Sequence, residues 1–273
     1  MRTSEETLAA LRSCPHYGIE ELRQIVAVLR SENGCPWDKE QTHESIRQDL
    51  LEECYEAVEA IDCESVPMMR EELGDVLLQV VFHCQIEAEQ AHFTFDDICD
   101  ELCRKLVVRH PHVFGDVTAE TSDEVLKNWD SIKAATKQQE TATETLEGVC
   151  KALPALMYAQ KLGKRAGRAG MDWRSAEDAF QYVRKETDEL EEAMQHGDAA
   201  QIEEELGDLL FSCVNTARHL HIDAETALRG AAEKFLRRFA ETERRVAADG
   251  KTMQELPIEE LDVYWDAAKE SLR

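Results

Sequence analysis

The sequence predicts an all-α protein in which one helical unit occurs twice. Long segments repeat apolar residues at helical spacing, Gly and Pro are sparse at 12 and 6 of the 273 residues, and few segments alternate as strands do. One acidic pattern, Glu-x-x-Glu followed by Glu-x-x-Asp, also appears in both halves at a constant offset. Its two copies are Glu53, Glu56, Glu72 and Asp75, and then Glu186, Glu189, Glu205 and Asp208.

The first half is expected to contain a leader and one helical unit. Residues 1–17 have weak periodicity and form the leader, and the unit spans 18–135. Its helices are predicted over 19–29, 42–62, 67–88, from 96 or 97 onward, and over 123–135. In the loop before the second of these helices, Trp37 could stack on a base, but we favour an aromatic anchor that fixes the loop to the core.

The second half repeats this plan. The segment 136–150 is polar and rich in Thr, Gln and Glu, and is interpreted as an interdomain linker. The second unit spans 151–273. Its helices are predicted over 153–168, 176–195, 199–219 and 224–248, with a short last helix that contains Trp265.

Basic and aromatic residues follow the repeat as well. After a deletion of four residues, two cations of the second unit fall where two cations of the first unit fall, and one Trp corresponds to another. The three pairs are Lys234 with Lys105, Arg238 with Arg109, and Trp265 with Trp129.

The register of the acidic pattern predicts two carboxylate patches. In an antiparallel hairpin, residues at the same height have a constant sum of sequence numbers, and Glu53 with Asp75 gives the same sum as Glu56 with Glu72. The second copy obeys the same rule. A spacing of three puts the two carboxylates of each helix on one face, so each hairpin can gather four of them.

Such a patch needs a counter-charge. Two unit charges about 6 Å apart repel by roughly 3 kcal/mol at an effective dielectric near 20, so the patch must bind a cation or take up protons. Mg²⁺ and Mn²⁺ prefer oxygen ligands, whereas zinc favours His and Cys. We therefore predict a Mg²⁺ site, with Mn²⁺ as the alternative ion.

Composition limits the other function classes. A net charge of -26 disfavours nucleic acid and anionic membranes as partners. Nine cysteines, no secretory signal and no apolar run long enough to cross a bilayer indicate reduced thiols in the cytoplasm. Zinc ligation by Cys99, Cys103, His110 and His112, and di-iron ligation through Glu-x-x-His pairs, both fit the spacing less well than structural roles do.

The acidic patterns, the loop Gly34-Cys-Pro-Trp-Asp38 and the segment His110-Pro-His-Val-Phe114 together resemble the MazG family of nucleoside triphosphate (NTP) pyrophosphohydrolases in its two-repeat form. The resemblance runs from about Ile19 to the C-terminus. It implies a homodimer, Mg²⁺ dependence, and hydrolysis of NTP to NMP and diphosphate in nucleotide-pool house-cleaning. A single hairpin leaves apolar surface uncovered, so four-helix-bundle cores formed by dimerisation are expected.

The resemblance also implies residue roles. The two sets of four carboxylates would bind metal, and Lys234, Arg238 and Trp265 would bind substrate, with Lys105, Arg109 and Trp129 as their first-unit equivalents. Glu204 and its equivalent Glu71 would assist as bases. Glu52 is excluded because its counterpart is Lys185.

We favour the second unit as the site of turnover, with Glu186, Glu189, Glu204, Glu205 and Asp208 as catalytic residues. Eight Lys and Arg lie in residues 151–186, against four in 18–53, and positive charge suits a triphosphate. The alternative function is a non-catalytic acidic module that binds a partner protein or buffers cations. Release of diphosphate from mixed NTPs would separate the two.

Overall fold

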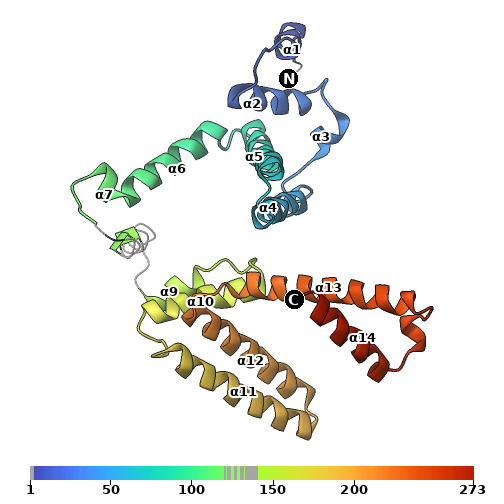
Figure 1. Ribbon diagram of the computed structural model, residues 1–273. Coiled ribbons are helices and arrows are strands. Elements are labelled where there is room, and N and C mark those ends of the chain that lie inside the picture. The colour runs from blue at the N-terminus through green and yellow to red at the C-terminus, as the bar shows by residue number, and fades with distance from the viewer. Residues whose placement is uncertain (1–2, 120, 122–123, 126–127, 130–131, 133–140) are drawn as a thin grey trace. The chain divides into compact units, whose positions relative to one another are not determined.

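The computed structural model describes residues 3–119, 121, 124–125, 128–129, 132 and 141–273. The chain forms two compact units, residues 1–132 and 133–273, each of which is considered by itself. Within the described ranges the regular structure is helical and contains no β-strand (Figure 1). The prediction of an all-α fold is confirmed.

Helices of the first unit follow the predicted order, with additions at both ends. They are α1 (Glu5–Arg12), α2 (Ile19–Leu29), α3 (Pro36–Glu40), α4 (Arg47–Asp62), α5 (Val66–Glu89), α6 (Phe95–Arg109) and α7 (Pro111–Phe114). The α4–α5 hairpin bears the first acidic set. Between its two helices, Glu64 adopts a positive φ of 51° that turns the chain back.

The core of the first unit lies where α2 and the start of α4 meet α5. Val26, Ile46 and Val81 are at most 2% exposed, and Phe82 and Ile86 complete the cluster. Burial of this many aliphatic groups is the main force that holds the hairpin to α2. The C-terminal half of α5, which contains Val81, Phe82 and Ile86, is therefore fixed by the core. Its N-terminal half extends beside α4.

Helices of the second unit reproduce the plan. They are α9 (Ala142–Glu147), α10 (Ala155–Arg168), α11 (Ala176–His196), α12 (Ala199–His219), α13 (Ala224–Ala248), the 3-10 helix η1 (Met253–Glu255) and α14 (Ile258–Ser271). At the tip of the α11–α12 hairpin, Gly197 has a φ of 73°, and the Asp198 side chain accepts hydrogen bonds from the first backbone N–H groups of α12. Glycine and an acidic cap are the residues that such a turn requires.

Helix α10 packs closely on α12 in the second unit. A Cβ added at Gly163 would collide with the Oδ1 of Asn215, a side chain that is fully buried. At the C-terminal end of α10, Asp172 accepts hydrogen bonds from Arg218 and His219 of α12. These contacts fix α12 against α10, and α11 packs on the other side of α12 (Figure 1).

Five expectations differ from the structure or lie partly outside it. The leader contains the helix α1, whose cap Ser4 accepts from Thr7. Helix α4 begins at Arg47 rather than at residue 42, because residues 43–46 form a turn that buries Ile46. Trp37 is 60% exposed and does not anchor its loop. Most of the predicted helix 123–135, and residues 136–140 of the predicted linker, lie outside the described residues.

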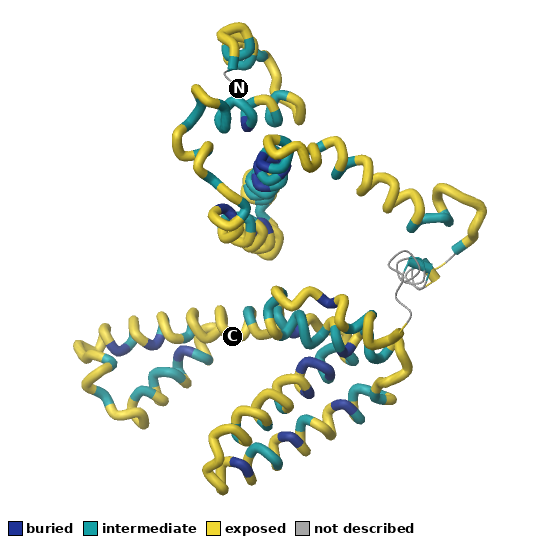
Figure 2. The backbone as a smooth tube through the Cα atoms, turned by 180° about the vertical axis from the view of Figure 1, so that it is seen from behind, coloured by how far each residue is buried: buried dark blue, intermediate teal, exposed yellow. Residues whose placement is uncertain are grey.

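Both hairpins leave apolar side chains uncovered within their own unit. Leu73 and Leu77 of α5 are 53% and 39% exposed, and Leu206 and Leu210 of α12 are 46% and 50% exposed. Figure 2 shows exposed residues over much of the α11–α12 hairpin. None of the helices in the described ranges is long and apolar enough to cross a membrane.

Candidate metal and nucleotide site

The N-terminal cage consists of Glu53 and Glu56 on α4 and Glu72 and Asp75 on α5. Three of these side chains, Glu53, Glu56 and Glu72, offer oxygens that all lie within 4.8 Å of one another. Burial raises the pKa of Glu53, and the charges of Asp75 and Glu56 raise it further. Asp75 is therefore close enough to act on the group, although it is not one of the three.

The C-terminal cage consists of Glu186 and Glu189 on α11 and Glu205 and Asp208 on α12. Here the three side chains within 4.8 Å of one another are Glu186, Glu205 and Asp208. Glu186 is the most enclosed of them at 8% exposure, and burial followed by a hydrogen bond with Glu189 raises its pKa. The pKa of Glu205 is raised by burial and then by the charge of Glu189.

Lys185 distinguishes the second cage from the first. Its Nζ lies 2.7 Å from Glu189 Oε1 and 3.7 Å from Glu186 Oε1. The hydrogen bond from Lys185 lowers the pKa of Glu189. The ammonium group therefore already neutralises part of the carboxylate charge in this cage.

The donor set of each cage fits a hard divalent cation. All the donor atoms are carboxylate oxygens, which Mg²⁺ and Mn²⁺ accept and which suit zinc less well. Burial is the main cause that raises the pKa values of Glu53, Glu72, Glu186 and Glu205, and repulsion from neighbouring carboxylates raises them further. A dication among them would remove that repulsion.

The predicted base and the predicted phosphate-binding cations of the second unit lie on α12 and α13. Glu204 is exposed, and its charge is one of several that raise the pKa of Glu205. Lys234 and Arg238 lie on α13, and in the described part of the chain neither forms an ion pair with a carboxylate. The α13–α14 hairpin extends away from the α11–α12 hairpin (Figure 1).

The predicted aromatic residues have nearby partners. On α14, Trp265 packs against Phe235 of α13, with ring centroids 5.3 Å apart. In the first unit the Arg109 guanidinium lies over the Trp129 ring at 5.3 Å, and Lys105 is exposed on the same helix. The structure thus brings Arg109 and Trp129 together, and their roles in binding substrate stay a prediction.

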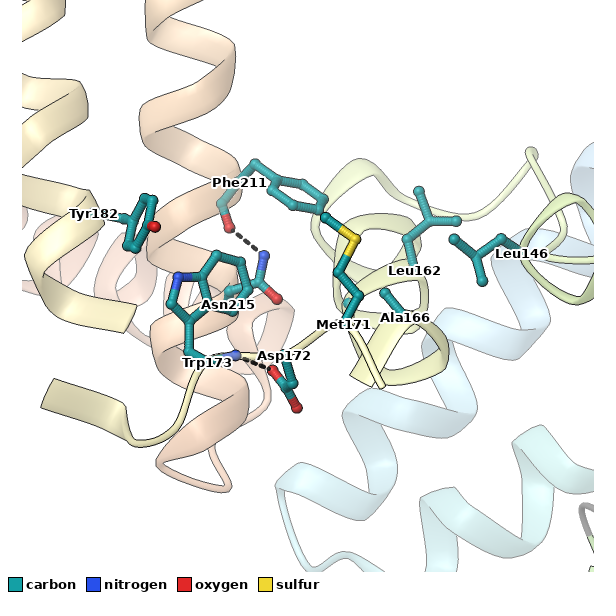
Figure 3. A pocket seen from close by; sticks show the side chains of 10 residues that line it. Leu146, Leu162, Ala166, Met171, Asp172, Trp173, Tyr182, Phe211 and Asn215 are labelled. Atoms are coloured by element: carbon teal, nitrogen blue, oxygen red, sulfur yellow. Dashed lines mark hydrogen bonds between the residues drawn. The ribbon is translucent and has the colours of Figure 1, made fainter. Parts of the chain in front are cut away.

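An apolar pocket adjoins the C-terminal cage along the hairpin. It has a volume of about 480 Å³ and is bounded by α9, α10, α11, α12 and the loop after α10. Figure 3 shows Trp173, Tyr182 and Phe211 around it, with Met171 on the opposite side. Tyr182 lies one helical turn before Glu186, and Phe211 lies nearly one turn after Asp208, so the pocket and the cage share two helices.

Comparison with known proteins identifies the family. A family model described as "MazG nucleotide pyrophosphohydrolase domain" matches the chain twice, over residues 41–114 and 174–241. The chain is 47% identical, over 92% of its length, to the "Nucleoside triphosphate pyrophosphohydrolase/pyrophosphatase MazG" of Thermotoga maritima, of which it covers 95%. It belongs to the MazG family.

Two further relatives extend the comparison. The "Nucleoside triphosphate pyrophosphohydrolase" of Escherichia coli strain K12 is also 47% identical, over 92% of this chain and 97% of that protein. The protein YabN of Bacillus subtilis is 42% identical over 94% of this chain, but the match covers only 53% of YabN. The two-repeat organisation is therefore shared with MazG proteins over nearly their whole length.

The two MazG matches include both cages and the cations of α6 and α13. They leave out α10, Trp129 and Trp265. Sequence reasoning missed Trp173, Tyr182 and Phe211 as lining of a pocket. The available signal was an aromatic residue in the loop just before the second acidic helix, but only packing against α10 shows that this residue borders a cavity.

Proposed function

We propose that this protein is a Mg²⁺-dependent nucleoside triphosphate pyrophosphohydrolase that cleaves NTP to NMP and diphosphate. The observation that carries the proposal is the C-terminal cage, three clustered carboxylates from two helices beside an aromatic pocket, in a chain of the MazG family. The relatives named above as nucleoside triphosphate pyrophosphohydrolases support it. Mn²⁺ has the same ligand preference and would serve as an alternative ion.

The residues divide the reaction between them. Glu186, Glu189, Glu205 and Asp208 would hold the cation, which offsets the charge of the phosphates and lowers the pKa of water. Glu204, at the edge of the cage, would accept a proton from the attacking water, assisted by whichever cage carboxylate orients it. Trp173 and Tyr182 offer apolar faces for the base, and the pocket excludes water from it.

We infer that a homodimer completes the site. Lys234 and Arg238 carry no carboxylate partner in the described residues, and the hairpin that bears them diverges from the cage of its own chain. A second copy packed on Leu206 and Leu210 would cover the apolar face as a four-helix core and would present its own α13. Guanidinium and ammonium donors then bind the phosphate tail.

We infer further that turnover takes place in the second unit and that the protein works in the cytoplasm without nucleic acid. The second unit has the excess of cations before its acidic helix and the aromatic pocket next to its cage. All nine cysteines are free thiols, which suits a reducing compartment. The charge of -26 opposes binding to a polyanion.

Matched double variants test the proposal. Glu205→Gln with Asp208→Asn disables the C-terminal cage, and Glu72→Gln with Asp75→Asn makes the equivalent change in the N-terminal cage. With a panel of NTPs and dNTPs in Mg²⁺, we expect the first variant to lose about a hundredfold or more of its diphosphate release and the second to lose little. The reverse pattern would move the active site to the first unit. No nucleoside monophosphate from any substrate in the wild-type protein would favour the acidic interaction module.

A further inference from the structure

Lys185 stands at one of two positions of the acidic helices where the two repeats carry opposite charge, the other being Arg70 of α5 against Glu203 of α12. It precedes Glu186 directly, and the equivalent position before Glu53 is Glu52. The rest of the pattern, Glu-x-x-Glu and Glu-x-x-Asp, is the same in both units. This position therefore changes the charge directly before the first cage carboxylate by two units, and Lys185 is the cation that the structure pairs with cage carboxylates.

The geometry shows what the lysine does to the cage. In the N-terminal cage, Glu56 is one of the three clustered carboxylates. Its counterpart Glu189 is not in the C-terminal cluster, where Asp208 takes the third place. Glu189 instead forms a close ion pair with Lys185, at 2.7 Å, and the same Nζ lies 3.7 Å from the enclosed Glu186.

We propose that Lys185 is an internal counter-cation that weakens the affinity of the C-terminal cage for free divalent ions, so that this cage is loaded by the metal–nucleotide complex. The inference rests on the function proposed above and concerns how that site acquires its ion. A free dication must approach a fixed ammonium group and compete for Glu189. A metal–triphosphate complex carries net negative charge, and its phosphate oxygens offer the displaced ammonium new acceptors.

The N-terminal cage has the opposite property. Glu52 adds negative charge beside Glu53, and no lysine occupies the equivalent place. This cage should bind free Mg²⁺ or Mn²⁺ in the absence of nucleotide. The same fold thus provides one site that holds an ion permanently and one that receives it with substrate.

The competing explanation is an ordinary surface ion pair. Lys185 and Glu189 are four residues apart on one helix, and exposed pairs of this kind contribute little to stability. The Lys185 side chain is 57% exposed, so its removal leaves the fold intact. If the pair were only a surface pair, removing it would not change the affinity of the cage for ions.

Binding of Mn²⁺ alone, without nucleotide, separates these explanations. Electron paramagnetic resonance and calorimetric titrations are made on the full chain with Glu72→Gln and Asp75→Asn, which silence the N-terminal cage. Because a unit charge about 5 Å from a dication in a largely solvated site changes its binding by roughly an order of magnitude, we expect Lys185→Met to tighten Mn²⁺ binding about tenfold and Lys185→Glu to tighten it further.

A matched control removes the same charge elsewhere in the unit. Lys251 is also partly exposed and paired with a carboxylate, Glu260, at 3.2 Å, but it follows α13 and lies outside the acidic helices. Lys251→Met should change Mn²⁺ binding less than about twofold, since exposed charges beyond a Debye length are screened. The reciprocal change Glu52→Lys, in a chain whose C-terminal cage carries Glu205→Gln and Asp208→Asn, should weaken binding at the N-terminal cage.

The outcomes keep this inference apart from the proposed function. Equal Mn²⁺ affinity in the wild-type and Lys185→Met cages, with clear binding in both, would overturn the counter-cation role and leave the enzyme proposal standing. No Mn²⁺ binding at the C-terminal cage in any variant, Lys185→Glu included, would also overturn the counter-cation role, whereas the enzyme proposal is tested separately by diphosphate release. Circular dichroism of Lys185→Met and Lys185→Glu confirms that folded proteins are compared.

Discussion

Gly163 and Gly207 are both glycines inside helices, but only Gly163 has a neighbour where a side chain would go. A Cβ at Gly163 would collide with Asn215, whereas at Gly207, and at its repeat equivalent Gly74, nothing lies within 4 Å. The repeated glycine beside the acidic pair therefore has no structural requirement within its own unit. Its open surface is left for a ligand or a second chain.

Substitution to Ala should have opposite effects at the two positions. Gly163→Ala should destabilise the second unit by about 1–3 kcal/mol, because the tight contact between α10 and α12 must open. Gly207→Ala should stabilise the unit by about 1 kcal/mol, because Ala has the higher helix propensity. Urea unfolding of both variants measures the difference. Equal effects would mean that α10 does not pack on α12 as described.

At the residue scale, the sequence predicts the carboxylates of the two cages but does not predict the neighbouring roles of Lys185 and Trp173. Equal heights on two helices follow from sequence numbers alone and predict four clustered carboxylates in each hairpin, of which the structure brings three together, Glu186, Glu205 and Asp208 in the second unit. The role of Lys185 needs side-chain positions, because on a helix drawn from sequence it is only one more exposed cation. Membership of Trp173 in a pocket depends on α10, which carries no acidic motif.

At the element scale, the loop before α4 is fastened to α5 by histidines that the second unit lacks. The Nδ1 atoms of His43 and His83 are 2.7 Å apart, and the His43 Nε2 lies 2.5 Å from Glu87 Oε1. His92 Nδ1 bonds the other oxygen of Glu87 at 2.7 Å. The hydrogen bond between the two Nδ1 atoms requires that only one of them carries a proton. If both were protonated, the two N–H groups would repel and this hydrogen bond would be lost.

This arrangement predicts acid sensitivity of the first unit. Burial, followed by the charge of His43, lowers the pKa of His83, so the unfolded chain binds more protons than the folded chain near pH 6. The contribution of His83 to the free energy of unfolding is fully present above about pH 6.5, the ordinary pKa of His, and falls as the pH drops below that value. The urea midpoint of the first unit, followed by proteolysis and mass spectrometry, should decline from pH 7.5 to 5.5.

His83→Phe should remove most of that decline, because the group that titrates is gone. The exposed His196 of α11 provides the control, and His196→Ala should leave the pH dependence of the first unit unchanged. An unaltered decline in the His83→Phe protein would show that other groups govern the acid response.

Helix ends followed the sequence where a side chain caps them. Helices α12 and α13 have the predicted bounds, since the Asp198 side chain accepts from the N–H groups of Ala200 and Gln201 and the Asp223 side chain from that of Thr226. The short helices α1 and α9 were missed because they are too brief for apolar periodicity to appear. Their capping residues were visible in the sequence, including Thr141 and Glu144 of a capping box.

At the scale of the whole molecule, the uncovered apolar faces predict self-association. Leu206 and Leu210 are about half exposed on the helix that bears Glu205 and Asp208. Burying one such side chain contributes about 1.5–3 kcal/mol, so a second copy of the hairpin is a favourable cover. One chain has a mass of 31.1 kDa, and light scattering coupled to size-exclusion chromatography should give twice that mass.

Charged residues on that face should separate the copies. Leu206→Glu with Leu210→Glu should give a monomer that stays helical and loses activity, because α13 of a second chain no longer reaches the cage. Leu236→Glu, which changes a leucine on α13 that is 66% exposed, tests whether any exposed leucine has this effect. A wild-type protein that is monomeric at all concentrations would contradict the four-helix core.

The short helix α9 has a practical consequence for dissecting the chain. Arg165 of α10 donates to the carbonyl of Thr145, Leu146 forms part of the pocket wall, and Val149 is 3% exposed. A fragment that begins at residue 151, where the change in composition suggests a boundary, would lack Thr145, Leu146 and Val149. The apolar pocket would then be open on one side. If such a fragment were inactive, the cause would be the incomplete pocket rather than an absence of catalytic residues. A fragment that begins before Thr141 avoids this error.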